Sequence, residues 1–370
     1  MTALRALAEH LAPAWLHGGQ GGRGAVGGNL QTIVSARLSR AAGDDPPRWR
    51  RQRWTTPDGD FIDVDFLDAP PAASHAASPA PRLVLFHGLE GNSSSHYSRA
   101  FAAVAAERGW RFAIPHFRGC SGEINRAPRA YHSGDHEEIG WILGRLARHW
   151  DAPPDDPVAS ANGQGAMHAV GISLGGNALL RWAQEAGEQA RTQVVSLAAL
   201  SSPIDLAAGG RAIAEGFNRW VYTRMFLASM KPKALSKWQQ HPGLFDRERL
   251  QAARTLYEFD NVFTAPLHGF RDTEDYWARA SAKPHLGRIR VPALVLNARN
   301  DPFVPAASLP APGSVPGGWV CLAQPPHGGH LGFASGGLPG DMRPFARRVC
   351  DWLASPDPTG PGTPREAAHG

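Results

Sequence analysis

A serine in a glycine-rich turn is the first residue whose surroundings could support chemistry. It is Ser173, at the centre of the G-x-S-x-G pattern in "GISLGGN". Strand-like residues precede this stretch, and the helix-like "NALLRWAQEA" follows it. A strand-to-helix turn this tight leaves no room for side chains two positions away, and it lifts the serine hydroxyl above the sheet. We therefore predict that Ser173 is a nucleophile; the alternative is an ordinary serine in a glycine-rich turn.

A second loop, "HGLEGNSSSHY", could supply hydrogen-bond donors to a reaction at this serine. It spans residues 87–97 and directly follows the apolar run "LVLF". One backbone N–H from such a loop, together with the N–H after the nucleophile, stabilises a developing oxyanion. The predicted pair is the N–H of Leu89 and the N–H of Leu174. The alternative is a plain loop that holds a buried histidine.

An acid and a base follow the serine along the chain. Asp301 comes after the strand-like "ALVLN", and His330 is the second histidine of "PPHGGHLGF". A carboxylate in this position orients a histidine and stabilises its imidazolium. The order serine, aspartate, histidine is the one that the α/β-hydrolase architecture requires. For Asp301 taken alone, an Asp-Pro turn is the alternative.

The two histidines of "HGGH" also raise the question of a metal site. Zinc needs three or four convergent ligands, and His327 and His330 supply two at most. No HExxH motif or cluster of aspartate and histidine accompanies them. We therefore expect no metal and no cofactor. We expect His330 to be the general base and His327 to have a supporting or structural role.

The elements that must position these residues alternate along the chain. Apolar β-like runs such as "RLVLFHG", "AMHAVGIS" and "VPALVLNARNDP" are separated by helix-like segments, of which "SRAFAAVAAERG" is one. This alternation predicts an α/β fold with a mostly parallel central sheet and helices on both faces. Ligands bind at the carboxyl ends of such strands, where the three candidate loops lie. Residues 203–284 break the rhythm and predict a mainly helical cap insertion.

Composition and charge argue against a membrane-spanning, secreted or nucleic-acid-binding protein. The chain has 370 residues, with 42% hydrophobic residues and a net charge of +5, and no apolar run reaches eighteen residues. A transmembrane helix is therefore not expected. Three widely spaced cysteines favour a reducing compartment, and we expect a cytoplasmic protein. The cluster "RWRRQRW" is interpreted as a solvated hairpin strand, because aromatic platforms and RNA-binding signatures are missing and no nucleic-acid partner is expected.

Taken together, the motifs resemble a known family. "GNLQTI", "HGLEGNSSSHY", "HFRGCSGEINR", "GISLGGN", "FDNVFTAPLHGF", "NARNDPF" and "HGGHLGF" occur in order between about residues 13 and 354. This series is similar to the YheT-like α/β-hydrolases, bacterial relatives of the ABHD esterase and lipase group. In "GNLQTI", Asn29 stands where a histidine is usual.

The resemblance implies an α/β-hydrolase fold and a carboxylic-ester hydrolase that acts on short- to medium-chain acyl esters, with monoacylglycerols as plausible substrates. It implies Ser173 as nucleophile, Asp301 as acid and His330 as base. His268 and Phe270 of "FDNVFTAPLHGF" are expected to fix the cap segment, while Arg118 and His132 are expected to be structural.

Three alternatives stay open at this point. An acyltransferase would use the same serine, aspartate and histidine with an alcohol as acceptor. A non-catalytic binding protein would share only the fold. Peripheral membrane contact could come from the N-terminal "LRALAEHLAPAWL" and the arginine cluster, although a packed helix is the simpler interpretation. The oligomeric state is not predicted. The expected boundaries are: N-terminal extension 1–52, core 53–202, helical cap 203–284, core 285–354 and disordered tail 355–370.

Overall fold

A single eight-stranded sheet forms the centre of the protein. The computed structural model describes residues 24–39, 46–68, 79–150, 165–337 and 339–356. The strand order is β1-β2-β4-β3-β5-β6-β7-β8, with antiparallel β1 and β2 at one edge and parallel pairing from β4 to β8. The strands are β1 Trp49–Thr55, β2 Phe61–Leu67, β3 Arg82–Phe86, β4 Arg111–Pro115, β5 Met167–Ile172, β6 Ser196–Leu200, β7 Ala293–Leu296 and β8 Val320–Ala323.

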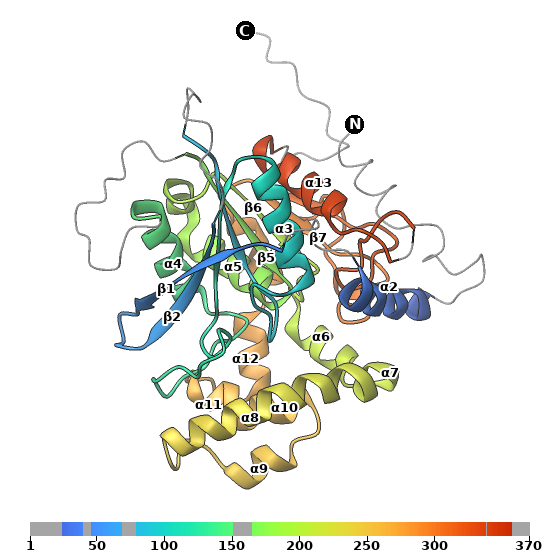
Figure 1. Ribbon diagram of the computed structural model, residues 1–370. Helices are drawn as coiled ribbons and strands as arrows, with labels where there is room; N and C mark the ends of the chain where they lie inside the picture. The colour runs from blue at the N-terminus through green and yellow to red at the C-terminus, as the bar shows by residue number, and fades with distance from the viewer. Residues whose placement is uncertain (1–23, 40–45, 69–78, 151–164, 338, 357–370) are drawn as a thin grey trace.

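Helices cover both faces of this sheet, as a parallel sheet requires. Helices α3 and α13 pack on one face, and α4 and α5 pack on the other (Figure 1). The α-helices are α2 Gly24–Leu38, α3 His96–Glu107, α4 His136–Arg148, α5 Leu174–Ala186, α6 Leu206–Ile213, α7 Gly216–Asn218, α8 Arg224–Gln240, α9 Arg247–Ala252, α10 Leu256–Phe259, α11 Ala265–Leu267, α12 Thr273–Ala280 and α13 Arg343–Ala354. The observed α/β architecture is the predicted one.

The segment between β6 and β7 is helical and projects from the strands' carboxyl ends (Figure 1). It runs from α6 to the 3₁₀ turn Lys283–Arg288, and it includes π-helical turns at Arg219–Thr223 and Asp260–Thr264. Its own apolar cluster is built around Leu227, Phe259 and Phe263. A separate cluster gives this segment internal cohesion, so it forms a helical layer over the sheet's edge.

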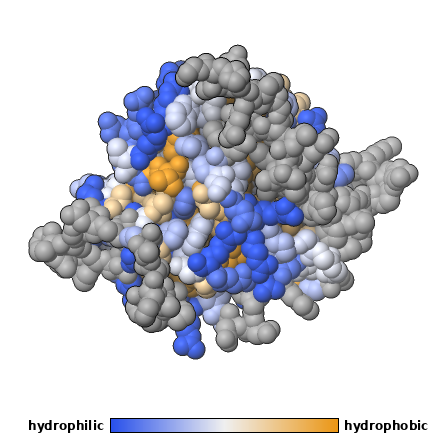
Figure 2. All heavy atoms as spheres, turned by 90° about the horizontal axis from the view of Figure 1, so that it is seen from above, coloured by the Kyte–Doolittle hydropathy of each residue, from blue (hydrophilic) through white to orange (hydrophobic). Residues whose placement is uncertain are grey.

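The opposite end of the molecule has a different character. Seen from above, away from α8 and α9, the described surface is mostly hydrophilic, with small apolar areas between the polar ones (Figure 2). None of the described helices is long and apolar enough to cross a membrane.

The arginine cluster at residues 48–54 forms part of the sheet. It lies on β1, which begins at Trp49, so the sheet starts before the boundary expected at residue 52. Arg51 pairs with Asp65 at 2.7 Å, and Arg53 pairs with Asp63 at 2.8 Å, both across the β1–β2 hairpin. Arg51 and Arg53 thus pair with buried carboxylates, which agrees with the hairpin interpretation. The N-terminal stretch and the tail from residue 357 lie outside the described residues.

Candidate active site

The turn between β5 and α5 holds Ser173 in an unusual backbone conformation. Its φ is 51° and its ψ is −118°, a region that non-glycine residues rarely occupy. A Cβ on Gly171 would lie 2.4 Å from the Cα of Gly176, and a Cβ on Gly175 would lie 2.4 Å from the carbonyl oxygen of His87. The turn therefore needs both glycines for close backbone approach, as the sequence pattern predicted.

Ser173, His330 and Asp301 form one hydrogen-bonded line. The Nε2 of His330 lies 2.9 Å from the Oγ of Ser173, and its Nδ1 lies 2.9 Å from Oδ2 of Asp301. With Nδ1–H donating to the carboxylate, Nε2 is left as an acceptor for the serine proton. The three loops meet because they follow the carboxyl ends of β5, β7 and β8, which are parallel strands of one sheet.

Asp301 is held in place by backbone donors. Its side chain is fully buried, and its Oδ1 accepts hydrogen bonds from the N–H groups of Phe303 and Val304 at 2.8 and 3.2 Å. The Phe303 ring also packs against the His330 imidazole, with ring centroids 4.4 Å apart. The carboxylate thus has a fixed orientation toward the imidazole, which favours a single tautomer.

Leu89, in the loop after β3, lines the cavity beside Ser173. Its neighbours are anchored on both sides: Gly88 N–H donates to the Tyr97 hydroxyl at 3.1 Å, and Glu90 N–H donates to the Tyr131 hydroxyl at 3.0 Å. The Leu174 N–H is the first of α5, so it has no acceptor within its helix. Leu89 and Leu174 both line the cavity at Ser173. Their N–H groups remain the predicted donors to an oxyanion.

His87 at the base of this loop is a structural residue. Burial lowers its pKa to about 3, so the ring is neutral. Its Nδ1–H donates to Gly88 O at 2.8 Å, and its Nε2 accepts from Phe117 N–H at 3.0 Å. The buried histidine therefore fixes the loop that carries the Leu89 N–H.

Helix α2 joins the loops of the acid and the base, a role that sequence reasoning missed. Gln31 Oε1 accepts from Asn300 Nδ2 at 2.8 Å and from Gly328 N–H at 3.0 Å. Thr32 Oγ1 accepts from the N–H of His330 at 2.9 Å. These residues belong to "GNLQTI". Their signal in the sequence was the helical spacing of Gln31, Thr32 and Ser35, which form a polar face that the structure buries.

Thr32 should act as a positioning residue for His330. We expect Thr32→Val to lower kcat about tenfold, with little change in KM, because the His330 backbone loses its acceptor and the imidazole drifts from Ser173. Thr32→Ser keeps the hydroxyl and should restore the wild-type kcat. Steady-state kinetics on a water-soluble ester would measure both. An unchanged kcat in Thr32→Val would show that the contact has no part in positioning.

The cavity beside Ser173 is small and largely apolar. It has a volume of about 130 Å³. Helices α6, α8, α10 and α12 contribute to its lining, and Ser173 and His330 lie at its wall. The apolar lining includes Leu206, Ile213, Phe226, Met230, Leu256, Trp277 and Phe303. A second cavity of about 80 Å³ adjoins it, sharing Leu89, Leu174, Met230, Asp260 and Tyr276. Ser173 thus lines the apolar cavity, and the smaller cavity beside it is also lined by Lys233 and Lys237.

Asp260 is a carboxylate on the wall shared by these two cavities, in the π-helical turn Asp260–Thr264. It accepts hydrogen bonds from Thr264 Oγ1 at 2.7 Å and from Trp277 Nε1 at 3.0 Å. Burial raises its pKa to about 6, against the effect of these hydrogen bonds. The pattern "FDNVFTAPLHGF" gave no indication of this role, because only the fold brings Asp260 to the cavity.

The raised pKa of Asp260 predicts a pH-dependent stability. Between about pH 4 and 6 the folded protein keeps this proton while the unfolded chain has lost it, so the free energy of unfolding falls as pH rises. Asp260→Asn removes this pH-dependent contribution to the free energy of unfolding. The asparagine oxygen can still accept the hydrogen bond from Trp277 Nε1. We expect the variant to gain about 2–3 kcal/mol relative to wild type between pH 4 and 7. Urea unfolding at several pH values would measure it; parallel pH profiles would contradict it.

Four other polar or aromatic residues singled out in the sequence lie in structural contacts. Arg118 is buried and pairs with Asp58, Asp60 and Glu138. His132 packs on His268 with ring centroids 4.4 Å apart and on Phe270 at 5.6 Å. Burial lowers the pKa of both histidines to about 3. Both rings are therefore neutral, and they pack against each other.

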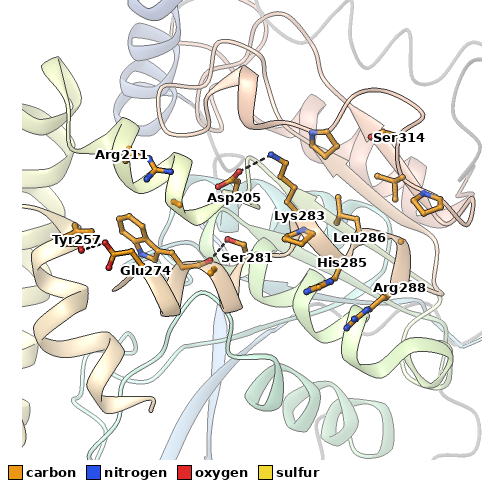
Figure 3. Close-up of a pocket in the computed structure, with 18 residues that line it drawn as sticks. Asp205, Arg211, Tyr257, Glu274, Ser281, Lys283, His285, Leu286, Arg288 and Ser314 are labelled. Atoms are coloured by element: carbon orange, nitrogen blue, oxygen red, sulfur yellow. Dashed lines mark hydrogen bonds and ion pairs between the residues drawn. The ribbon is translucent and has the colours of Figure 1, made fainter. Parts of the chain in front are cut away.

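A larger hollow of about 950 Å³ lies on the other side of Trp277, beside α6, α12 and the turn Lys283–Arg288 (Figure 3). Lys283 pairs there with Asp205 at 3.1 Å, and Tyr257 donates to Glu274. None of Ser173, Asp301 and His330 belongs to its lining. The larger hollow is therefore separate from the candidate active site.

Comparison with known proteins places this geometry in a family. The family model for the alpha/beta hydrolase fold matches residues 81–336. The candidate esterase YheT of Escherichia coli K12 is 38% identical over 90% of this chain and 92% of its own. Phospholipase ABHD3 of Mus musculus is 27% identical over 79% of this chain and 68% of its own. Monoacylglycerol lipase ABHD2 of Mus musculus is 26% identical over 88% and 78%, respectively. The chain therefore belongs to the α/β-hydrolase family, as a YheT-like member.

Proposed function

We propose that the protein is a serine hydrolase of carboxylic esters with short- to medium-chain acyl groups. The observation that carries this proposal is the line Ser173–His330–Asp301, with both hydrogen bonds at 2.9 Å, at the wall of an apolar cavity. The relatives named as esterase, phospholipase and monoacylglycerol lipase support hydrolysis of an ester over another reaction of the same fold.

The proposed reaction proceeds through an acyl-enzyme. His330 Nε2 takes the proton of Ser173 while the serine Oγ attacks the ester carbonyl carbon, and the carbonyl oxygen becomes an oxyanion. The N–H groups of Leu89 and Leu174 stabilise this charge. The imidazolium then gives its proton to the leaving alcohol as the carbon–oxygen bond breaks. A water, deprotonated by His330, attacks the acyl-enzyme, and the acid leaves as Ser173 regains a proton.

The two cavities suggest where the parts of the ester lie. The apolar cavity suits the acyl chain, because burial of each methylene stabilises the complex by about 0.8 kcal/mol. The adjoining cavity, with its charged side chains, suits the alcohol portion. At about 130 Å³ the apolar cavity is smaller than the roughly 300–1,000 Å³ of pockets for drug-sized ligands, which favours short chains.

A panel of p-nitrophenyl esters from two to sixteen carbons tests the proposal. We expect turnover well above that of the Ser173→Ala variant, with the highest kcat/KM for the short and medium chains. No turnover of any ester above the variant's background would overturn it. Preference for the longest chains would keep the esterase and refute the assignment of chain length.

A further inference from the structure

Helix α2 has its polar and apolar faces in reversed positions. Gln31, Thr32 and Ser35 face the protein and are at most 7% exposed. Leu30 and Ile33 lie on the opposite face of the helix and Leu38 is its last residue; all three side chains are exposed. A surface helix in water normally buries its apolar side. Here the buried side is polar because it forms hydrogen bonds with the loops that carry Asp301 and His330. Apolar side chains of the helix are therefore exposed to solvent.

A second exposed apolar group lies on the helical segment near α2. Phe217, Trp220 and Met225 lie in a row from α7 to the start of α8, and Trp220 is 68% exposed. In the described residues, eight large apolar side chains are exposed, and six of them belong to these two groups. Such a concentration marks an interaction surface rather than scattered exposure. We call the six residues the apolar rim: Leu30, Ile33, Leu38, Phe217, Trp220 and Met225.

The two segments that carry these groups both pack on the loop that holds Asp301. A Cβ on Gly28 of α2 would lie 1.9 Å from the carbonyl oxygen of Asn300. Asn218 at the end of α7 donates to the Pro302 carbonyl at 2.8 Å. In Figure 1, α2 and α7 lie on the same side of the molecule. The apolar rim therefore flanks the acid loop of the candidate active site.

The charges around the apolar rim indicate the kind of partner. Arg37, Arg219 and Arg224 are exposed, and none forms an ion pair among the described side chains. Glu215 is the only carboxylate in residues 24–38 and 214–226. Exposed Trp, Phe and Leu with flanking arginines are typical of a surface that lies in the interface of an anionic bilayer.

We propose that the apolar rim docks the protein on an anionic phospholipid surface. The aromatic and aliphatic side chains would enter the headgroup boundary while the three arginines meet lipid phosphates. The same segment leads to the candidate site, since Phe226 and Met230 of α8 line the apolar cavity. Docking goes beyond the proposed ester hydrolysis and does not depend on it, because binding needs no reaction at Ser173.

Vesicle flotation with the full-length Ser173→Ala protein tests this inference apart from catalysis. We expect it to float with vesicles of phosphatidylglycerol and phosphatidylcholine in a one-to-three ratio, and about tenfold less with phosphatidylcholine alone. A triple variant, Phe217→Ser with Trp220→Ser and Met225→Ser, should lower flotation about tenfold. A second triple variant, Leu30→Ser with Ile33→Ser and Leu38→Ser, should lower it by the same factor.

A matched control replaces apolar residues that are exposed elsewhere. Val195→Ser with Tyr257→Ser removes side chains that are 45% and 37% exposed but lie outside both segments, and it should float as the parent does. Failure of the parent to float with anionic vesicles would overturn the proposal. So would undiminished flotation of the rim variants, which would assign binding to another segment. A dimer that the rim variants convert to monomer, with flotation unchanged, would instead identify the face as an interface between two copies.

Discussion

Ser173→Ala should abolish ester turnover, with a loss in kcat of about ten-thousandfold or more. The variant keeps the tight turn and removes only the Oγ that lies 2.9 Å from His330 Nε2. No covalent acyl-enzyme can then form, and only binding and the oxyanion donors can still assist water. Labelling by a fluorophosphonate probe, quantified per chain by intact-mass spectrometry, should fall from one adduct to none.

Ser121→Ala is the matched control for this experiment. Ser121 also stands beside a glycine, in "RGCSGE", but its hydroxyl donates to Asp63 Oδ2 at 2.6 Å, on the hairpin side of the sheet. We expect this variant to be labelled and to turn over ester like the wild type. Labelling of the Ser173→Ala protein at full stoichiometry would show that another residue is the nucleophile.

Replacing each histidine of "HGGH" by alanine should have very different effects on ester turnover. His330→Ala removes the only imidazole that contacts Ser173 in the described structure, and we expect turnover to fall about ten-thousandfold. His327 does not line either cavity at Ser173, so His327→Ala should cost less than about tenfold. Steady-state kinetics on one soluble ester would compare them.

The integrity of both variants can be checked independently. Urea unfolding should show that each is folded under the assay conditions, because Asp301 keeps its hydrogen bonds from Phe303 and Val304 when the imidazole is gone. Equal losses of turnover in the two folded variants would remove His330 from its proposed role as the base.

Local sequence was sufficient to predict the fold class and where the loops of the candidate site lie. Each of Ser173, Asp301 and His330 follows a strand-like run within a few residues, and parallel strands place such loops at one edge. The helical segment between β6 and β7 was also predicted, since residues 203–284 contain no buried strand pattern. These features depend on short-range periodicity and on chain order.

Contacts between distant segments could not be predicted in the same way. Gln31 meets Gly328, which is 297 positions away, and the Tyr131 hydroxyl meets Glu90 from a separate loop. No periodic pattern relates such pairs, because the tertiary fold alone brings them together. The outward apolar face of α2 was missed for the same reason: it becomes unusual only when the buried polar face is known.

The bridge that α2 makes between the acid and base loops has a consequence for the order of assembly during synthesis. Gln31 and Thr32 emerge from the ribosome before Asn300, Gly328 and His330. The contacts of the bridge join residues up to 298 positions apart, and contacts of such high sequence separation form late and slowly. The hydrogen-bonded line at Ser173 is therefore completed only after the segment with His330 has been made, and a nascent or truncated product that lacks this segment has Ser173 without its histidine partner.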